Sequence, residues 1–380
     1  MQNIHSAYTS HKGEHLYFLD GFRGLLALWV YLGHLSYAVG YKNYILGMHA
    51  LAVDLFMVLS GFLMVHSWQK SQTLGLPTPQ LAWKFYKTRF FRIAPLYYVL
   101  LLICYLFLTE LAYMSDYIQK VMPPPWAEGM VSYDPHAGWN FNTLRWLYLH
   151  ATFAFGLVPG MEASTPLPDW SLSLEMQFYL LFPVLLMCLR RAPILLLATI
   201  ASGLALISPH LFGNYLTPGV FAHFGQPSFL PYRLNAFMAG MIVAYYLAQQ
   251  ANGSLTPYKK WIAVLACIIC VITLSKPVIG AFILFAMLAL RKISFLSALL
   301  GYKSLKKLGD ISYSLYLSHL LIVTPVVYWL FWFPDFLSLP ALTRFTIATA
   351  CTVPLIIPTS YLLHRLIETP FIRFGKRLAI

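Results

Sequence analysis

Ten apolar runs divide the chain almost from end to end, and most are long enough to cross a lipid bilayer. A membrane-spanning helix needs about 20 predominantly apolar residues. Only 10% of the 380 residues are charged, whereas soluble domains carry about a quarter. The sequence therefore predicts an all-α integral membrane protein with a single domain over residues 1–380. The runs cover 16–39, 48–66, 92–113, 170–189, 193–209, 232–249, 260–275, 277–290, 310–333 and 343–366.

Lys and Arg residues gather between alternate runs, and this asymmetry predicts which way each run crosses. The alternation fits ten crossings with both termini in the cytosol. It fails if the ambiguous run 144–159 also crosses, so that run is predicted to be re-entrant or to lie on the outer interface. Cytosolic positions are predicted for the basic segments 67–92, 190–191, 259–260, 291–307 and 373–377. Outer positions are predicted for 40–47, 114–143, 210–231 and 334–341.

The formal net charge of +13 is explained by these basic loops, because no basic run stands apart from the apolar ones. Membrane lipids are therefore expected partners and nucleic acid is not. The longest outer loop, 114–143, is interpreted as a lid or as a solvated connection. Cys267 and Cys270 have a spacing found in metal and redox sites, but no His or acidic residue lies near them. Helix packing is the preferred interpretation, and no metal is predicted.

Two residues that are energetically unfavourable inside a membrane, Arg23 and His34, share one face of the first run. They are eleven positions apart, which is about three helical turns or about 16 Å. A charge near the middle of a bilayer costs about 2.5–3.5 kcal/mol. Arg23 is expected at the cytosolic end, where it can snorkel or bind an anion. A neutral imidazole at His34 is suited to accept a proton from a hydroxyl; a hydrogen-bonded contact between helices is the alternative.

Two carboxylates also fall in apolar runs. Asp54 lies in the second run, which is expected to pair with the first, so Asp54 is predicted to bond His34 and fix its tautomer; a structural polar contact is the alternative. The neighbouring Ser60 and Gly61 are small enough for close helix approach. Glu175 is a candidate to bind a sugar hydroxyl, to share protons with His34, or to tie helices together.

Other polar side chains recur at helical spacing. Arg89 and Arg92 are three residues apart at the expected cytosolic start of a helix. A helix N-terminus with two guanidiniums would form a phosphate site, and a positive-inside anchor is the alternative. Tyr316 and His319 share a face of a later run and are interpreted as interhelical hydrogen-bonding residues.

Taken in order, these segments resemble the membrane-bound acyltransferase-3 family. The resemblance spans about 19–378 and implies transfer of an acyl group, usually acetyl from cytosolic acetyl-CoA. The implied acceptor is a hydroxyl of a cell-envelope or lipid-linked glycan, such as the O-antigen of a lipopolysaccharide. Its blocks are LDGFRGLLALWVYLGH, VDLFMVLSGFLM, RFFRIAPLYY, WSLSLEMQFYLLFPVLL, LGDISYSLYLSHLLIV and RLIETPFIRFGKRL, with RLNAFMAGMIVAYYL as a looser match.

The resemblance assigns roles to the residues that match its motifs. Arg23 and His34 match the family's first-helix pair, and Arg89 with Arg92 match its Arg-x-x-Arg motif. Glu175 falls in its Trp-Ser-Leu-Ser-x-Glu block, where Met176 replaces a second Glu found in many members. The chain is expected to be of the stand-alone type, without a fused esterase-like domain, in the inner (cytoplasmic) membrane of a bacterium.

The combined hypothesis is an acyl-CoA-dependent O-acyltransferase. Arg23, Arg89 and Arg92 are predicted to bind the phosphates of acetyl-CoA, while His34, oriented by Asp54 or Glu175, acts as the general base. Direct transfer and an acyl-enzyme route both stay open, as do the acceptor, the acyl length and the oligomeric state. The main alternative is a secondary transporter or flippase with a buried proton relay, although no repeated half or matched pair of broken helices is found.

Overall fold

Each of the ten predicted apolar runs contains a helix in the computed structural model, which describes residues 17–122, 144–214 and 217–378. Across these ranges the chain forms helices and no strand. The all-α fold class is therefore confirmed for the described residues. The helices in the runs are α2 (Tyr17–Ala38), α4 (Ala50–Gln72), α5 (Thr78–Leu106), α8 (Trp170–Arg191), α9 (Ile194–Phe212), α10 (Leu234–Ala251), α11 (Pro257–Val271), α12 (Lys276–Ala289), α15 (Ser312–Leu330) and α17 (Ala341–Leu363).

Six helices of the described chain are long and apolar enough to cross a membrane: α4, α5, α8, α9, α15 and a 38-residue helix over Ala341–Leu378. The last consists of α17, a π-helical turn (His364–Glu368) and α18 (Thr369–Leu378). Helix α12 and α13 (Ser294–Leu300), bent by 96° at their junction, form a seventh candidate. The remaining predicted spans are shorter or less apolar, so ten crossings with cytosolic termini stay a prediction.

Two predicted boundaries are wrong. Helix α5 begins at Thr78, well before the apolar run at 92, because the amphipathic stretch before that run is also helical and buries Leu81 and Phe85. Residues 114–121, assigned to an outer loop, belong instead to α6 (Leu108–Val121). The rest of the proposed lid or solvated connection, 123–143, lies outside the described residues.

The ambiguous run 144–159 does not form a continuous span. It contains α7 (Leu144–Ala151) and a 3₁₀ turn (Ala154–Leu157), separated at Phe153, whose φ of 59° is left-handed. Eight α-helical residues extend only about 12 Å, which is far less than the hydrocarbon core of a bilayer. The structure agrees with the prediction that this run does not cross; re-entrant and interfacial placements both stay predictions.

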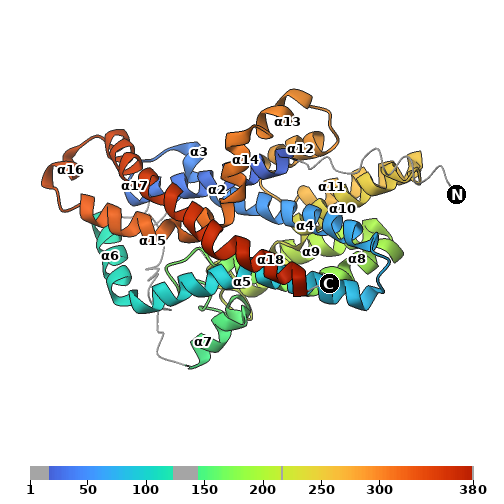
Figure 1. Ribbon diagram of the computed structural model, residues 1–380, viewed down its shortest axis with the longest axis horizontal. Helices are drawn as coiled ribbons and strands as arrows, with labels where there is room; N and C mark the ends of the chain where they lie inside the picture. The colour runs from blue at the N-terminus through green and yellow to red at the C-terminus, as the bar shows by residue number, and fades with distance from the viewer. Residues whose placement is uncertain (1–16, 123–143, 215–216, 379–380) are drawn as a thin grey trace.

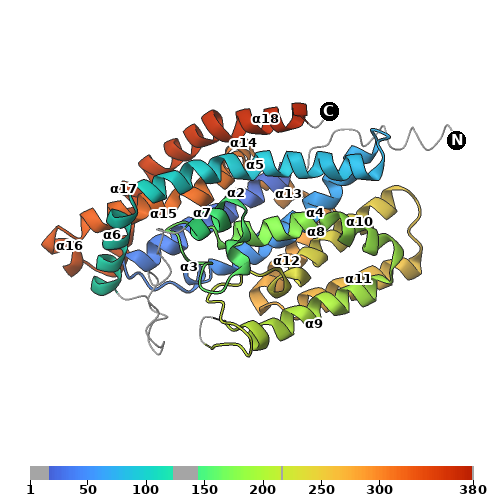
Figure 2. The ribbon, with the colours of Figure 1, turned by 90° about the horizontal axis from the view of Figure 1, so that it is seen from below.

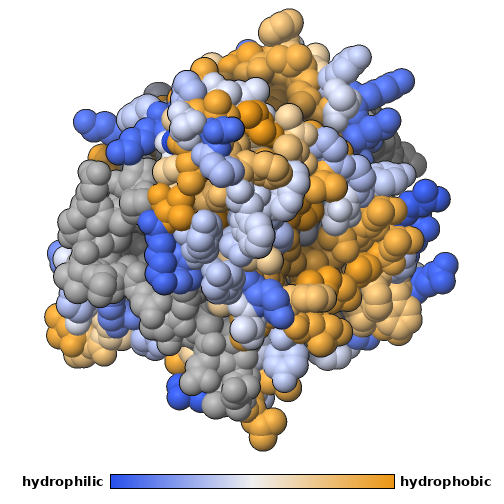
Figure 3. Space-filling model, turned by 90° about the vertical axis from the view of Figure 1, so that its left-hand side faces the viewer, coloured by the Kyte–Doolittle hydropathy of each residue, from blue (hydrophilic) through white to orange (hydrophobic). Residues whose placement is uncertain are grey.

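Three of the segments predicted to be cytosolic lie toward one end of the bundle, whereas 291–307, which includes α13 and part of α14 (Lys303–Asp310), lies nearer the middle of its length (Figures 1 and 2). In Figure 2 the α4–α5 and α10–α11 connections and the end of α18 lie on the right, opposite α16 (Pro334–Ser338). Figure 1 shows the same separation from another side. Figure 3 views the α16 end, where polar and apolar side chains are mixed. The placement of these three segments agrees with the predicted charge alternation. Large apolar side chains are exposed along the outer helix faces, as contact with lipid requires, for example Leu102, Leu180, Leu204 and Ile268.

Helices α4 and α10 approach so closely that their backbones touch. A Cβ atom on Gly61 would overlap the carbonyl of Phe237, and one on Gly240 would overlap the carbonyl of Val58. Small residues allow such close approach between membrane helices. The close packing predicted at Gly61 is therefore confirmed, and Gly240 is its counterpart on α10.

Candidate functional site

Three histidines from α2, α15 and the turn before α4 meet inside the bundle. His34 Nδ1 lies 2.9 Å from His319 Nε2, and the two rings stack with centroids 5.0 Å apart. The ring of His49 lies 4.5 Å from that of His34. His319 is fully buried, His49 nearly so, and His34 is partly exposed. His34 therefore faces other polar side chains rather than lipid.

The backbone holds both neighbours of His34 in place. His319 Nδ1 lies 2.6 Å from the Tyr316 carbonyl oxygen, and His49 Nδ1 lies 3.0 Å from that of Leu46. Gly33 leaves the room that the His49 ring occupies, since any Cβ there would collide with it. Among the described residues, no group of three His, Cys, Asp or Glu side chains is arranged to hold a metal ion.

The predicted pairing of Asp54 with His34 is wrong. Asp54 Oδ1 forms an ion pair with Arg233 Nε at 2.5 Å. The register of α4 and α10 explains this choice, because Asp54 lies seven residues before Gly61 and Arg233 lies seven residues before Gly240. The two helices run in the same direction. They therefore contact each other at the two glycines and again, seven residues earlier, at Asp54 and Arg233. Asp54 is buried, and this carboxylate neutralises the partly buried guanidinium that faces it.

Glu175 lies where α4 meets α8, and it does not bond His34 either. Its carboxylate accepts hydrogen bonds from Ser60 Oγ, at 2.5 Å, and from the hydroxyl of Tyr179. Glu175 also interacts electrostatically with Arg23 and Arg89. Glu175 therefore lies with the predicted phosphate-binding arginines rather than with the histidines.

Three arginines predicted to share one function lie together. Arg23 interacts electrostatically with Arg92, and Arg92 with Arg89. Arg89 Nη2 donates to Ser67 Oγ at 3.0 Å. In the described part of the chain, the buried Nε of Arg89 has no hydrogen-bond partner. An unpaired buried donor is costly, so the geometry leaves Arg89 one N–H to offer to an anion.

One part of the predicted phosphate site is missing. Because α5 starts at Thr78, Arg89 and Arg92 lie about three and four turns inside the helix. The free backbone N–H groups of a helix start are therefore not beside them. Any anion at Arg89 and Arg92 would therefore be bound without the N-terminus of α5.

A cavity that the sequence did not reveal lies between the ends of α4, α8 and α10. Its volume is about 430 Å³, and Arg190 and Gln249 are among the residues that line it. Arg190 Nη2 donates to Gln72 Oε1 at 3.0 Å, and both residues also line a neighbouring cavity of about 280 Å³. Sequence reasoning treated Arg190 only as part of a basic loop. The cavity requires three helix ends that are far apart in the chain to meet, and helical spacing carries no such signal.

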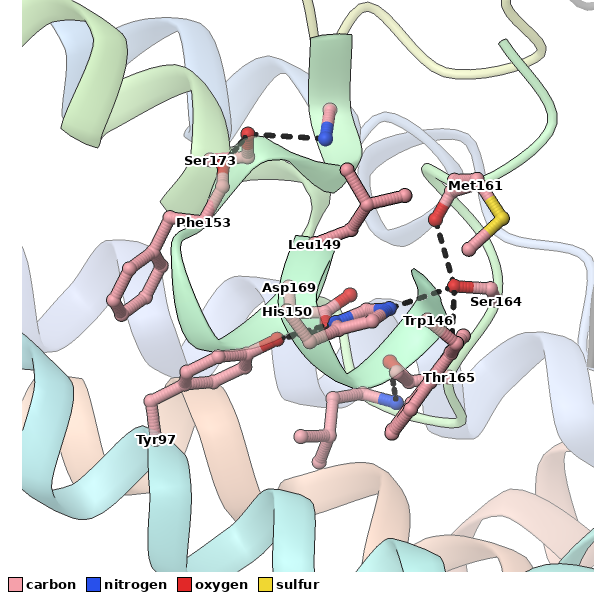
Figure 4. A network of polar contacts seen from close by, with 12 residues as sticks. Tyr97, Trp146, Leu149, His150, Phe153, Met161, Ser164, Thr165, Asp169 and Ser173 are labelled. Carbon is pink, nitrogen blue, oxygen red and sulfur yellow. Dashed lines mark hydrogen bonds and ion pairs between the residues drawn. The ribbon is translucent and has the colours of Figure 1, made fainter. Parts of the chain in front are cut away.

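A second polar network lies beneath α7 and the segment that follows it (Figure 4). The Tyr97 hydroxyl lies 2.7 Å from His150 Nδ1 and 3.0 Å from Asp169 Oδ2. His150 Nε2 lies 2.8 Å from Ser164 Oγ. Burial lowers the pKa of His150 to about 3 and raises that of Asp169 to about 7. The sequence analysis missed this cluster, in which a hydroxyl of α5 bridges α7 and the start of α8.

This second network is closed to substrates in the structure. His150 and Ser164 are fully buried, and the His150 ring lies between Trp146 and Phe155 with ring centroids 4.3 Å away on each side. Its role is to anchor the 144–169 segment against α5 and α8. The Tyr316 hydroxyl, which donates to the Pro168 carbonyl and bonds Ser171, links the same segment to the helix that carries His319.

Comparison with known proteins gives three findings. The family model of the acyltransferase-3 type, described as an acyltransferase domain, matches residues 16–361. Peptidoglycan O-acetyltransferase OatA of Listeria monocytogenes serovar 1/2a (strain ATCC BAA-679 / EGD-e) is 26% identical over 347 residues, which cover 83% of this chain and 50% of OatA. Protein 2 in picA locus of Rhizobium radiobacter is 39% identical over 84 residues, which cover 22% of this chain and 41% of that protein. The chain thus spans half or less of the length of these two curated relatives. No solved structure matches it.

Proposed function

The chain belongs to the acyltransferase-3 family, and from this premise we propose that it transfers acetyl from acetyl-CoA to a hydroxyl of a cell-envelope glycan. Membership makes the protein a membrane acyltransferase; the donor, the acceptor and the residue roles are the proposal. The similarity to a peptidoglycan O-acetyltransferase supports an envelope glycan as the acceptor. A bacterial inner membrane is the proposed location, since the acceptor classes considered, peptidoglycan and O-antigen, are bacterial.

One observation carries the proposal: Arg23 of α2 lies with Arg89 and Arg92 of α5, and the interior imidazole of His34 is about three turns further along α2. Acetyl-CoA is a soluble anion with three phosphates joined to its thioester by a long flexible arm. Arg23, Arg89 and Arg92 would bind the phosphates, because guanidiniums form strong charge-assisted hydrogen bonds with them. The unpaired Nε of Arg89 suits that role. The arm would then extend along α2 toward His34.

At the other end of the site, His34 would act as the general base. It takes the proton of the acceptor hydroxyl while the hydroxyl oxygen attacks the thioester carbonyl. The C–S bond then breaks, and the CoA thiolate leaves. In this scheme Glu175 balances the charge of the arginines that it contacts electrostatically. Asp54 has a different task, holding α4 to α10 through Arg233.

The function is tested by mass spectrometry of envelope glycans from cells with and without the protein. Cells that contain it are expected to yield glycan fragments heavier by the mass of one acetyl group, and mild base is expected to remove that mass because it is an ester. Identical spectra would contradict the proposal. Movement of a substrate into proteoliposomes without any acyl-CoA would instead favour the transporter alternative.

A second test concerns the arginines. Replacing both Arg89 and Arg92 with Gln is expected to weaken acetyl-CoA binding by about 100-fold, since each charged hydrogen bond contributes about 1.5–3 kcal/mol. The wild-type affinity should fall as salt is raised, and the variant should lose most of that dependence. Binding is measured by titrating acetyl-CoA into purified protein at several salt concentrations.

The matched control for this test replaces Lys259 and Lys260 with Gln. Both lysines are exposed at the α10–α11 connection, and the change removes the same formal charge. This variant should bind acetyl-CoA within about twofold of wild type, because exposed charges contribute little. An equal loss of affinity in both variants would mean that Arg89 and Arg92 act only through the overall field or as membrane anchors.

A further inference from the structure

A continuous line of hydrogen-bonding groups runs from the backbone of α15 to His34. It begins at the Tyr316 carbonyl, passes 2.6 Å to His319 Nδ1, crosses the ring, and continues 2.9 Å from His319 Nε2 to His34 Nδ1. His319 and Tyr316 are buried, so water does not compete for these bonds. The far nitrogen of His34, Nε2, is the end of the line.

The carbonyl at the start of this line fixes every proton along it. A carbonyl oxygen only accepts, so His319 Nδ1 must carry its hydrogen. In a neutral ring the other nitrogen is then a bare acceptor, so His319 Nε2 accepts and His34 Nδ1 must donate. A neutral His34 consequently has its lone pair on Nε2. The tautomer of His34 is thus set through His319 by a peptide group on another helix, and the backbone of Val30, one turn earlier on α2, also interacts with the His34 ring.

We propose that His319 is the positioning residue of this enzyme, holding His34 as the Nδ1–H tautomer so that Nε2 is free to act as the base. The proposal rests on the function proposed above and deepens it. In the Ser-His-Asp triad a carboxylate plays this part. Here a neutral imidazole does, because both predicted carboxylates are used elsewhere: Asp54 pairs with Arg233, and Glu175 lies with the arginines.

A neutral positioning group suits a site inside a membrane bundle. A buried carboxylate without a full set of partners carries a large desolvation cost, whereas a second imidazole carries no charge in the resting state. When His34 accepts a proton on Nε2, the lone pair of His319 Nε2 stabilises the cation through the bond to His34 Nδ1. The other ring beside His34 is that of His49, and an imidazole is either neutral or positive, so it offers no opposite charge.

The same line of bonds also limits where the proton can go. An amide carbonyl does not take up the proton of His319 Nδ1 and pass it on, so the line is a dead end for proton transfer. The proton that His34 receives from the acceptor hydroxyl must therefore leave through Nε2 again. In the proposed reaction the CoA thiolate released beside His34 accepts it and leaves as a thiol. One nitrogen therefore serves both steps, as Nε2 of the histidine does in a Ser-His-Asp triad.

The first test reads the tautomer without any substrate. In purified protein with ¹⁵N-labelled histidine, the His34 signal is assigned as the one missing from His34→Ala. At neutral pH it should show a protonated Nδ1 and a bare Nε2. His319→Gln keeps an acceptor oxygen near the position of Nε2 and should preserve this tautomer; His319→Leu removes the acceptor and should shift His34 to a mixture or to the Nε2–H form. A wild-type His34 that is protonated on Nε2, or an unchanged tautomer in His319→Leu, would overturn the proposal.

The second test measures transfer. Radiolabelled acetyl from acetyl-CoA is followed into the endogenous glycan of membranes that contain equal amounts of each variant. His319→Leu should lower kcat about 100-fold or more, by analogy with the loss caused by a wrong tautomer in a triad, with the KM for acetyl-CoA within about twofold. His319→Gln should restore kcat to within about tenfold of wild type. Full activity in His319→Leu would refute the positioning role alone, and full activity in His34→Ala would remove His34 as the base, while no acetyl transfer by the wild-type protein would refute the proposed function itself.

Discussion

Cells whose only copy of the protein carries His34→Ala are expected to have no measurable acetyl on their envelope glycan, although the protein still inserts and folds. A positioned acid–base group contributes about 10²–10⁴-fold to a rate, and no other described side chain takes the place of His34 on α2. The ester content of the glycan, measured by release with mild base, checks the result. His34→Gln should be equally inactive, because an amide cannot act as the base.

The matched control for this experiment is His210→Ala. His210 is an exposed histidine at the end of α9, so its loss removes an imidazole without disturbing the histidine cluster. This variant should acetylate the glycan as wild type does. Normal acetylation by His34→Ala, at a protein level equal to that of the control, would remove His34 from the mechanism.

The sequence predicts which side chains share a helix face, and the structure bears this out where the partner lies on the same helix. Glu175 and Tyr179 are one turn apart on α8, and they bond each other. Helical periodicity is a property of the backbone, so faces follow from spacing alone. It also placed His34 on a face that proves to point into the bundle.

Partners on other helices could not be predicted in this way. His34 and His319 are 285 residues apart, and the sequence around His319 predicts a hydrogen-bonding residue without indicating its partner. Asp54 was paired with His34 because successive helices often lie side by side. The pairing is wrong because Gly61 and Gly240 bring α4 against α10. Which two helices touch depends on the fit between small residues at distant positions, and a single sequence does not encode that fit in its spacing.

The ion pair between Asp54 and Arg233 leads to a prediction that separates a structural role from a catalytic one. Asp54→Ala should destabilise the protein by about 3 kcal/mol, the lower end of the range for breaking a buried pair, because it leaves the Arg233 guanidinium without its counterion. Arg233 is the partner with the more exposed side chain, at 30% against 9%, which is why the lower end is expected. Unfolding of the detergent-solubilised protein by a denaturing detergent or by heat measures the change.

The double variant Asp54→Leu with Arg233→Met decides between the two roles. Replacing both members of a buried pair with apolar residues of similar volume is often neutral or stabilising, so most of the lost stability should return. If Asp54 only holds α4 to α10, acetyl transfer should return with it, because His34 takes its orientation from His319. A double variant that folds as stably as wild type yet transfers no acetyl would mean that the pair acts in the reaction, and transfer by a stable Arg233→Met single variant would then assign the loss to the carboxylate. Only that outcome would restore Asp54 to the catalytic role predicted from its position in the sequence, since a folding defect could no longer explain the loss.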